Sequence, residues 1–324
     1  MVKRQNLIVA NGLKKYFPLF KSPFSFAKGV IKAVDGVDLV IKEGETLGLV
    51  GESGCGKSTM GKLLLRLEDP TGGEVYFEGE NISRMRGKAL RHLRKRAQII
   101  FQDPYSSLNP RMRVKEIVEE PLIIHRLFEQ KREREKEIRR LLEIVGLEED
   151  YLYRYPHEFS GGQRQRIGIA RALALRPQFI VTDEPVSALD VSIQAQILNL
   201  LKELQDNFHL TYLFISHDLN VVRYISQRVA VMYLGRIVEL ASRNEIYQNP
   251  SHPYTQSLLK AIPQPDPTLR GISSPLSGDP PSLVNLPVGC PFHPRCPQVQ
   301  QMCCQSSPSL KELSPGHYVA CLRI

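Results

Sequence analysis

Short apolar runs alternate with amphipathic stretches over most of the chain. The runs at 47–51 (LGLVG), 97–102 (AQIIFQ), 179–185 (FIVTDEP) and 211–218 (TYLFISHD) are short and end in glycine or in polar residues. Between them, residues 130–145 and 192–205 repeat apolar positions at helical spacing. Strands that alternate with helices predict an α/β fold with a mostly parallel sheet covered by helices.

The pattern changes near residue 240. Residues 229–240 (VAVMYLGRIVEL) predict a closing hairpin with Gly235 at its turn. Beyond them lie 14 of the 23 prolines and five of the six cysteines, with little periodicity. Such a stretch buries little apolar area, so we expect it to be ordered only if an additional cross-link, such as a bound metal, holds it together. We therefore expect one domain over 1–240 and a small irregular domain over 241–324.

Composition narrows the class of protein. With 42% hydrophobic and 24% charged residues, a chain of 324 residues can bury a core, which excludes global disorder. No apolar run approaches the roughly 20 residues that cross a bilayer, and the N-terminus does not resemble a signal peptide. We therefore expect a protein that is cytoplasmic or that sits on a membrane through a partner. The net charge of +9 permits nucleic acid, acidic lipid or nucleotide partners. The basic run at 84–96 lacks interleaved aromatic residues, which favours a solvated helix over a nucleic-acid site.

A phosphate-binding loop follows the first apolar run. Residues 51–58 (GESGCGKS) fit the pattern G-x-x-x-x-G-K-[ST] and precede a helical stretch at 59–67. Glycines let backbone N–H groups face phosphate oxygens, and a helix N-terminus favours an anion. Lys57 is expected to reach the β- and γ-phosphates and the Ser58 hydroxyl to bind Mg²⁺.

Two acids end the third apolar run. We expect Asp183 to hold Mg²⁺ and Glu184 to polarise the attacking water, because neighbouring side chains on a strand point to opposite faces. Residues 159–163 (FSGGQ) open a helix, with Ser160 as N-cap. This is a second anion-binding terminus in a chain with one phosphate loop. It therefore suggests that the second terminus serves the nucleotide of a neighbouring subunit.

Taken in order, these motifs resemble those of the ATP-binding-cassette (ABC) transporter ATPases. GESGCGKS resembles their Walker A motif, FIVTDE their Walker B motif and FSGGQ their signature. Gln102 in FQDP resembles the Q-loop glutamine, residues 187–190 (SALD) the D-loop, and His217 the switch histidine. The resemblance implies a P-loop NTPase (RecA-like) core, an N-terminal antiparallel β subdomain, a helical signature subdomain at about 104–170, and ATP hydrolysis.

The resemblance also implies roles for individual residues. Glu184, His217 and Gln102 would be catalytic, and Ser58, Gln102 and Asp183 would bind Mg²⁺. Adenine would stack on Phe17, with Tyr16 as the neighbouring candidate. In a head-to-tail dimer, the second subunit would cap ATP with Ser160, Gly161, Gly162 and Gln163. The phosphate loop would contribute Gly51, Ser53, Gly54, Cys55, Gly56, Lys57, Ser58 and Thr59.

A closer resemblance is to the oligopeptide/dipeptide importer ATPases, carried by residues 249–259 (NPSHPYTQSLL) and 101–111 (FQDPYSSLNPR). It implies dipeptide or oligopeptide uptake at the cytoplasmic face of the membrane, with the chain bound peripherally. The implied partners are two permease subunits, an extracytoplasmic peptide-binding protein and a second homologous ATPase, with a homodimer or a monomer in isolation as alternatives, and no nucleic acid. Another solute, such as nickel or glutathione, is an alternative cargo. A soluble nucleic-acid-associated ABC ATPase is a more distant alternative.

The cysteine cluster comprises Cys290, Cys296, Cys303, Cys304 and Cys321. A reducing compartment disfavours disulfides, and a structural zinc site would normally show a C-x-x-C pair, which is absent here. Four thiolates at irregular spacing suit an iron–sulfur cluster, so zinc, iron–sulfur and free thiols all stay open on chemistry. The importer resemblance implies a [4Fe–4S] cluster on Cys290, Cys296, Cys303 and Cys321, with Cys304 as a substitute for Cys303 and zinc as the alternative metal.

Overall fold

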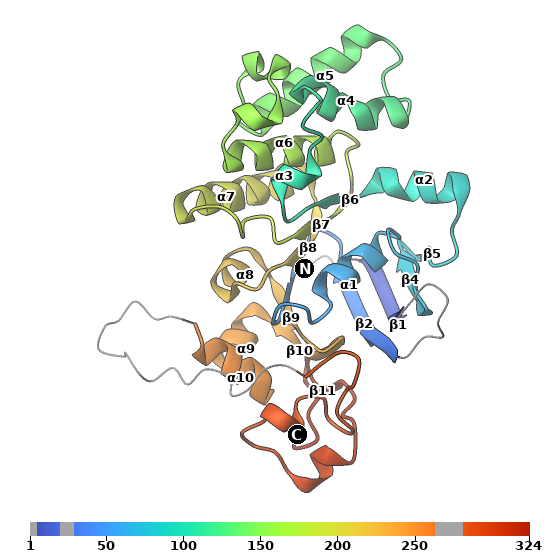
Figure 1. Cartoon of the computed structure of the whole chain (residues 1–324), viewed down its shortest axis with the longest axis vertical. Helices are drawn as coiled ribbons and strands as arrows, with labels where there is room; N and C mark the ends of the chain where they lie inside the picture. The colour runs from blue at the N-terminus through green and yellow to red at the C-terminus, as the bar shows by residue number, and fades with distance from the viewer. Residues whose placement is uncertain (1–4, 20–28, 263–280) are drawn as a thin grey trace. The chain divides into compact units, whose positions relative to one another are not determined.

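A computed structural model describes residues 5–19, 29–262 and 281–324. The chain divides into two compact units, the first formed by residues 1–84 and 214–324 and the second by residues 85–213. Strand β8 (Thr211–Ile215) carries the chain from the second unit back into the first. Figure 1 shows the elements of both units along the chain.

The first unit begins with an antiparallel sheet in the order β2-β1-β4-β5. Its strands are β1 (Asn6–Leu19), β2 (Gly29–Lys42), β4 (Gly72–Phe77) and β5 (Glu80–Asn81). Val37, Leu39 and Ile41 of β2 are buried, because alternate positions of a strand face the core. Ile8 and Leu13 of β1 are both fully buried although they lie an odd number of positions apart, since the pairing shifts register between Ala10 and Leu13. The N-terminal antiparallel subdomain implied by the family resemblance is therefore present.

The same unit holds a second set of strands in the order β11-β12-β10-β9-β3. Strand β3 (Thr46–Val50) is buried at every position, pairs parallel to β9 (Arg228–Tyr233), and leads through the phosphate loop into α1 (Lys57–Leu64). Strands β9 and β10 (Arg236–Ser242) form the predicted hairpin. Gly235 has φ 81° at its turn, a conformation that glycine adopts without strain.

Regular elements also follow residue 240, where the hydrophobic pattern indicated irregular structure. They are α9 (Arg243–Gln248), α10 (Pro253–Lys260), the 3-10 turns η4 (His293–Arg295) and η5 (Gln301–Cys304), and strands β11 (Lys311–Ser314) and β12 (His317–Val319). A further helix, α8 (Leu219–Ile225), precedes the hairpin. Strand β12 pairs with β10, with Val319 opposite Glu239. Attachment to an existing sheet orders these short elements, and periodicity along the chain does not reveal such attachment.

The second unit is mostly helical. It contains α2 (Gly87–Arg96), β6 (Ala97–Ile100), α3 (Pro104–Ser107), α4 (Val114–Ile124), α5 (Lys131–Ile144), the 3-10 turns η1 (Glu149–Tyr153) and η2 (Pro156–Glu158), α6 (Gly161–Leu173), β7 (Phe179–Asp183) and α7 (Val191–Phe208). Strands β6 and β7 are parallel, as the pattern predicted. Helices α5 and α7 confirm the two amphipathic stretches, and each buries its apolar stripe. Among the described helices, none is both long and apolar enough to cross a bilayer.

Candidate functional site

The phosphate loop lies between β3 and α1, in the first unit. Its glycines are required by close backbone approach: at Gly56, where φ is 107°, a Cβ atom would lie 2.0 Å from the Ala33 carbonyl oxygen. Gly51 is equally confined, since its Cβ would lie 2.2 Å from the Met232 carbonyl oxygen. Gly56 is also the N-cap of α1 and has no side chain that could cap the first N–H groups of the helix. The loop therefore presents backbone donors at a helix N-terminus, which suits phosphate.

Lys57 is held within this loop. Its Nζ donates to the carbonyl oxygens of Gly51 at 2.8 Å and Glu52 at 2.9 Å, and the residue is only 5% exposed. Cys55 is buried, and burial raises the pKa of its thiol, so the thiol stays neutral. Ser58 and Thr59 follow in the first turn of α1. The lysine is thus pre-positioned at the loop by its own backbone.

The acidic pair lies at the end of β7, in the second unit. The strand ends at Asp183, which is 6% exposed, while Glu184 has already left it with φ 47°. The expectation that two strand residues point to opposite faces is therefore wrong for this pair. A left-handed turn, rather than strand alternation, separates the two carboxylates, and such a conformation in a non-glycine residue is strained.

Gln102 and Glu184 are brought together in the second unit. The Gln102 Nε2 atom donates to Glu184 Oε2 at 2.8 Å, although 82 residues separate them along the chain. The Ser187 hydroxyl donates to the Glu184 carbonyl oxygen at 3.1 Å, and Asp190 caps α7 by accepting from the Ile193 amide at 3.0 Å. Two side chains predicted to be catalytic are therefore hydrogen-bonded to each other.

The signature segment begins α6 in the same unit. Ser160 is its N-cap, as predicted, and accepts from the Gln163 amide at 3.3 Å, while Gln163 Oε1 accepts from the Ser160 amide at 3.0 Å. This reciprocal capping box defines the first turn of the helix. Gly162 packs so closely that a Cβ atom would lie 2.4 Å from Ile193 Cγ2, whereas the nearest contact of a Cβ at Gly161 would be at 3.1 Å.

His217 lies in the first unit, just after β8, and its side chain is exposed. The neighbouring Ser216 amide donates to the Leu49 carbonyl oxygen at 3.2 Å, which ties this turn to the strand that leads into the phosphate loop. Asp218 then caps α8 by accepting from the Asn220 amide at 2.7 Å. The predicted site residues thus divide between the units, with residues 51–59 and His217 in the first and Gln102, Asp183, Glu184 and 160–163 in the second.

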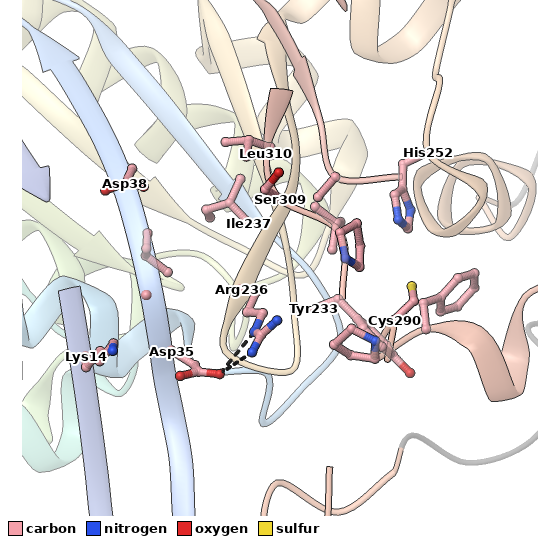
Figure 2. A pocket seen from close by; sticks show the side chains of 17 residues that line it. Lys14, Asp35, Asp38, Tyr233, Arg236, Ile237, His252, Cys290, Ser309 and Leu310 are labelled. Carbon is pink, nitrogen blue, oxygen red and sulfur yellow. Dashed lines mark hydrogen bonds and ion pairs between the residues drawn. The ribbon is translucent and has the colours of Figure 1, made fainter. Parts of the chain in front are cut away.

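The two candidate adenine-stacking rings are consecutive in β1. The Tyr16 hydroxyl donates to Asp35, which also accepts from Arg236 at 2.7 Å; burial and then the bond to Asp35 raise the pKa of Tyr16 to about 12. Figure 2 shows the Asp35–Arg236 pair at a cavity of about 380 Å³. Phe17 pairs instead with Ile31, which lines a different cavity of about 270 Å³ beside Ser53 and Gly54 of the phosphate loop. This placement favours Phe17.

The cysteines lie in the C-terminal part of the first unit. Cys303 is buried, Cys290, Cys296 and Cys321 are partly buried, and Cys304 is exposed. Burial raises the pKa of Cys290, whose amide donates to the Cys303 carbonyl oxygen at 2.8 Å. Among the described residues, however, no group of three or more His, Cys, Asp or Glu side chains is arranged to hold a metal ion. The ring of His317 is hydrogen-bonded to Glu239, and the ring of His293 lies within hydrogen-bond distance of the Cys290 carbonyl oxygen.

Comparison with known proteins extends these observations. The ABC transporter family matches residues 34–187, and the family described as oligopeptide/dipeptide transporter, C-terminal region, matches residues 238–303. The oligopeptide transport ATP-binding protein AppF of Bacillus subtilis (strain 168) is 52% identical over 321 residues, which cover 98% of this chain and 97% of AppF. The chain belongs to the ABC transporter ATPases. Within that family it carries the oligopeptide/dipeptide transporter C-terminal region.

Other comparisons agree with this assignment. The dipeptide transport ATP-binding protein DppF of Haemophilus influenzae is 51% identical over 320 residues, covering 98% of this ABC ATPase and 97% of DppF. A dimeric ATP-binding cassette solved in a post-hydrolysis state with ADP and Pi aligns with a TM-score of 0.64 at 33% identity, over 73% of this chain and 98% of that one. The cbiO1 cassette of Clostridium perfringens aligns equally well at 26% identity, over 75% and 91%. They confirm the P-loop NTPase fold and the ATP hydrolase activity expected from the motifs.

Three residues at the phosphate loop of this ABC ATPase were not anticipated from its motifs. They are Glu52 of the loop itself, Tyr254 of α10 and Arg295 of η4. The Glu52 amide donates to the Tyr254 hydroxyl at 3.0 Å, and the Glu52 carboxylate accepts from Arg295. A carboxylate within an anion-binding loop is stabilised by a cation nearby, so Glu52 in the loop sequence was the signal from which a basic partner could have been expected. The sequence does not indicate which of its 43 Lys and Arg residues supplies the cation.

Proposed function

We propose that this ABC ATPase supplies the energy for uptake of dipeptides or oligopeptides through a membrane importer. Similarity to the oligopeptide and dipeptide transport ATP-binding proteins AppF and DppF over 98% of the chain carries this proposal, because it includes the C-terminal region. We assign ATP hydrolysis to residues 1–240, with a helical subdomain at about 104–170, and a transporter-specific role to residues 241–324.

ATP binding is assigned to the loop at 51–59. Its backbone N–H groups and the α1 N-terminus would surround the β- and γ-phosphates, and Lys57 would exchange its bonds to the Gly51 and Glu52 carbonyl oxygens for phosphate oxygens. Phe17 would stack on adenine, since its cross-strand neighbour Ile31 lines the cavity beside the loop. Tyr16 is the weaker candidate because its hydroxyl is bound to Asp35.

Hydrolysis is assigned to Glu184, which would accept a proton from the attacking water. The bond from Gln102 holds one carboxylate oxygen, so Gln102 orients Glu184, and the exposed His217 would contact the γ-phosphate. Mg²⁺ would neutralise phosphate charge, and the donor set of Ser58, Asp183 and Gln102 suits it because all three offer oxygen atoms.

We assign the signature residues Ser160, Gly161, Gly162 and Gln163 to the nucleotide of a second ATPase subunit in a head-to-tail dimer. A capping box already fixes the first turn of α6, so the helix N-terminus is preorganised for phosphate. The second subunit would be a homologous chain, and two permeases with an extracytoplasmic peptide-binding protein would complete the importer at the cytoplasmic face of the membrane.

Reconstitution in proteoliposomes tests this function. The chain is combined with candidate permeases, a partner ATPase and the binding protein, and uptake of labelled dipeptide is compared with uptake of nickel and glutathione. We expect ATP-driven peptide uptake, which Glu184→Gln abolishes while it still binds ATP and accumulates a closed dimer. Uptake of nickel or glutathione alone would replace the peptide assignment, and undiminished turnover by Glu184→Gln would remove Glu184 from its role.

A metal site on Cys290, Cys296, Cys303 and Cys321 is a separate proposal. The described cysteines are not arranged around a metal ion, so the proposal rests on the resemblance of this segment to the importer ATPases. A [4Fe–4S] cluster would staple the C-terminal segment, and the exposed Cys304 is the weaker third ligand. Anaerobic purification followed by iron, sulfide and zinc analysis tests it. Brown protein with about four irons per chain is expected. One zinc ion per chain would show that the cysteines bind zinc instead of iron, and metal-free protein would refute the metal site.

A further inference from the structure

Glu52 places a negative charge in the loop that must receive the most negative part of ATP. It is the second residue of the phosphate loop, and its own carbonyl oxygen accepts from Lys57. An uncompensated carboxylate at this position would repel a triphosphate and would compete for the lysine. The loop therefore requires a partner that neutralises Glu52 and holds it in a fixed direction.

Arg295 is that partner. Its two terminal nitrogens donate to the two Glu52 carboxylate oxygens at 2.7 Å and 2.9 Å, a bidentate pair. The Arg295 side chain is 5% exposed and that of Glu52 is 25% exposed, so water screens the pair poorly. The guanidinium also lies 6.0 Å from the centroid of the Tyr233 ring.

The backbone of Glu52 is held as well. Its amide donates at 3.0 Å to the hydroxyl of Tyr254, a fully buried residue. The Tyr254 ring packs against Tyr233 and Phe292, with ring centroids 4.6 Å and 5.3 Å away. Two separate segments beyond residue 240 thus hold Glu52: η4 binds its side chain and α10 binds its backbone amide.

Arg295 is positioned by the segment that carries the cysteines. It ends the turn η4, between Cys290 and Cys296, where the His293 amide donates to the Cys290 carbonyl oxygen at 3.0 Å. The Cys290 amide donates in turn to the Cys303 carbonyl oxygen at 2.8 Å. A rearrangement that displaces η4 would therefore displace the guanidinium that holds Glu52.

We infer that Arg295 is a positioning residue for ATP binding, and that through its pair with Glu52 the cysteine-bearing segment sets the nucleotide affinity of the phosphate loop. Both terminal nitrogens of Arg295 donate to Glu52. Arg295 acts by neutralising Glu52 and by fixing the entry to the loop. The inference concerns the ATP site itself and does not depend on which solute is transported or on whether the cysteines hold a metal.

The test measures binding of a non-hydrolysable ATP analogue and of ADP to the full chain by calorimetry. Arg295→Met keeps the apolar stem and removes the charge; we expect about tenfold weaker binding of the ATP analogue and a smaller loss for ADP, which has fewer charges to repel. The KM for ATP should rise more than kcat falls. Combining Arg295→Met with Glu52→Gln should restore most of the affinity, because the repelling charge is then gone.

Arg228→Met is the matched control. Arg228 pairs with the buried Glu45 at 3.0 Å in the same unit, at the end of β3 opposite the phosphate loop. It should lower the melting temperature without weakening nucleotide binding, which separates a general loss of stability from the effect on the loop. Arg295→Met with an affinity within about twofold of the wild type, or a double variant whose losses multiply, would refute the inference.

Hydrogen exchange provides a second readout. Because coupling between sites is reciprocal, nucleotide should slow amide exchange at 290–304 in the wild-type chain. In Arg295→Met this protection should be lost while protection of the phosphate loop at saturating nucleotide remains. Equal protection of 290–304 in both proteins would show that the segment responds to nucleotide without Arg295, which contradicts the inference.

Discussion

We expect the buried His252 to make the C-terminal part of the first unit less stable in acid. The residue is 2% exposed, and its Nδ1 accepts from the Tyr254 amide at 3.0 Å, so it caps α10 as a neutral ring. Burial lowers the pKa of His252 to about 4 from an ordinary value of 6.5. Protonation would place a charge in the core and would also remove the lone pair that caps the helix.

The sign and size of the effect follow from these two pKa values. Between pH 6.5 and 4 the unfolded ring binds a proton that the folded ring does not, so the stability conferred by the neutral ring is complete above pH 6.5 and is lost as the pH falls towards 4. At pH 5 the unfolded ring is protonated and the folded ring is mostly neutral. The unfolded ring is therefore favoured over about 1.5 pH units, from 6.5 down to 5, which lowers the unfolding free energy at pH 5 by about 2 kcal/mol relative to pH 7.

Urea unfolding at pH 7 and pH 5 measures this dependence, with hydrogen exchange in α10 as the local readout. His252→Asn is the comparison, because asparagine can cap the helix through its side-chain oxygen but does not titrate in this range. We expect the variant to lose about 2 kcal/mol less than the wild type between the two pH values. If both proteins lose the same stability, His252 is not the titrating group and its low pKa is wrong.

Three further substitutions test other parts of the structure. Glu239→Leu should destabilise the chain by about 3 kcal/mol or more and increase hydrogen exchange in α10 and β12. The reason is that this buried carboxylate accepts from the Ser251 amide at 2.8 Å, the His252 amide at 3.0 Å and His317 at 2.8 Å. An unchanged urea midpoint would contradict this prediction. Gly56→Ala should abolish ATP binding, measured by calorimetry, since its Cβ would lie 2.0 Å from the Ala33 carbonyl oxygen, whereas Gly79→Ala, where no atom lies within 4 Å of the new Cβ, should bind normally. Gln102→Ala should lower kcat for ATP hydrolysis about 10- to 100-fold with little change in ATP affinity, as expected for a residue that orients Glu184; a pure KM effect in steady-state kinetics would instead place Gln102 in ATP binding.

Local chemistry made the phosphate loop and the signature predictable. Gly51, Gly56 and Lys57 lie within one short stretch of the chain, so spacing alone indicated the phosphate loop, and Ser160 directly before the signature helix indicated its N-cap. The strands β3, β6, β7 and β8 were also evident, because buried strands are continuous apolar runs.

Long-range partners were not predictable in this way. Arg295 lies 243 residues from Glu52, and no periodicity in either segment indicates the pair. Glu184 was placed on the strand because it directly follows the apolar run that begins at Phe179, but the backbone turns at that residue to φ 47°. The order of the C-terminal segment likewise depends on Glu239 and on contacts among Tyr233, Tyr254 and Phe292, which come from three separate parts of the chain.

The hydrogen bond between Gln102 and Glu184 bears on how much ATP the cassette hydrolyses when it is not transporting. Because this amide directs the carboxylate, a displaced Gln102 would leave Glu184 poorly oriented towards water, so we expect a cassette in that state to consume little nucleotide. Return of the amide to Glu184 would then act as the trigger for turnover. Because Gln102 lies just before α3, a protein that pushes on this short helix could convert a mechanical displacement directly into a chemical step.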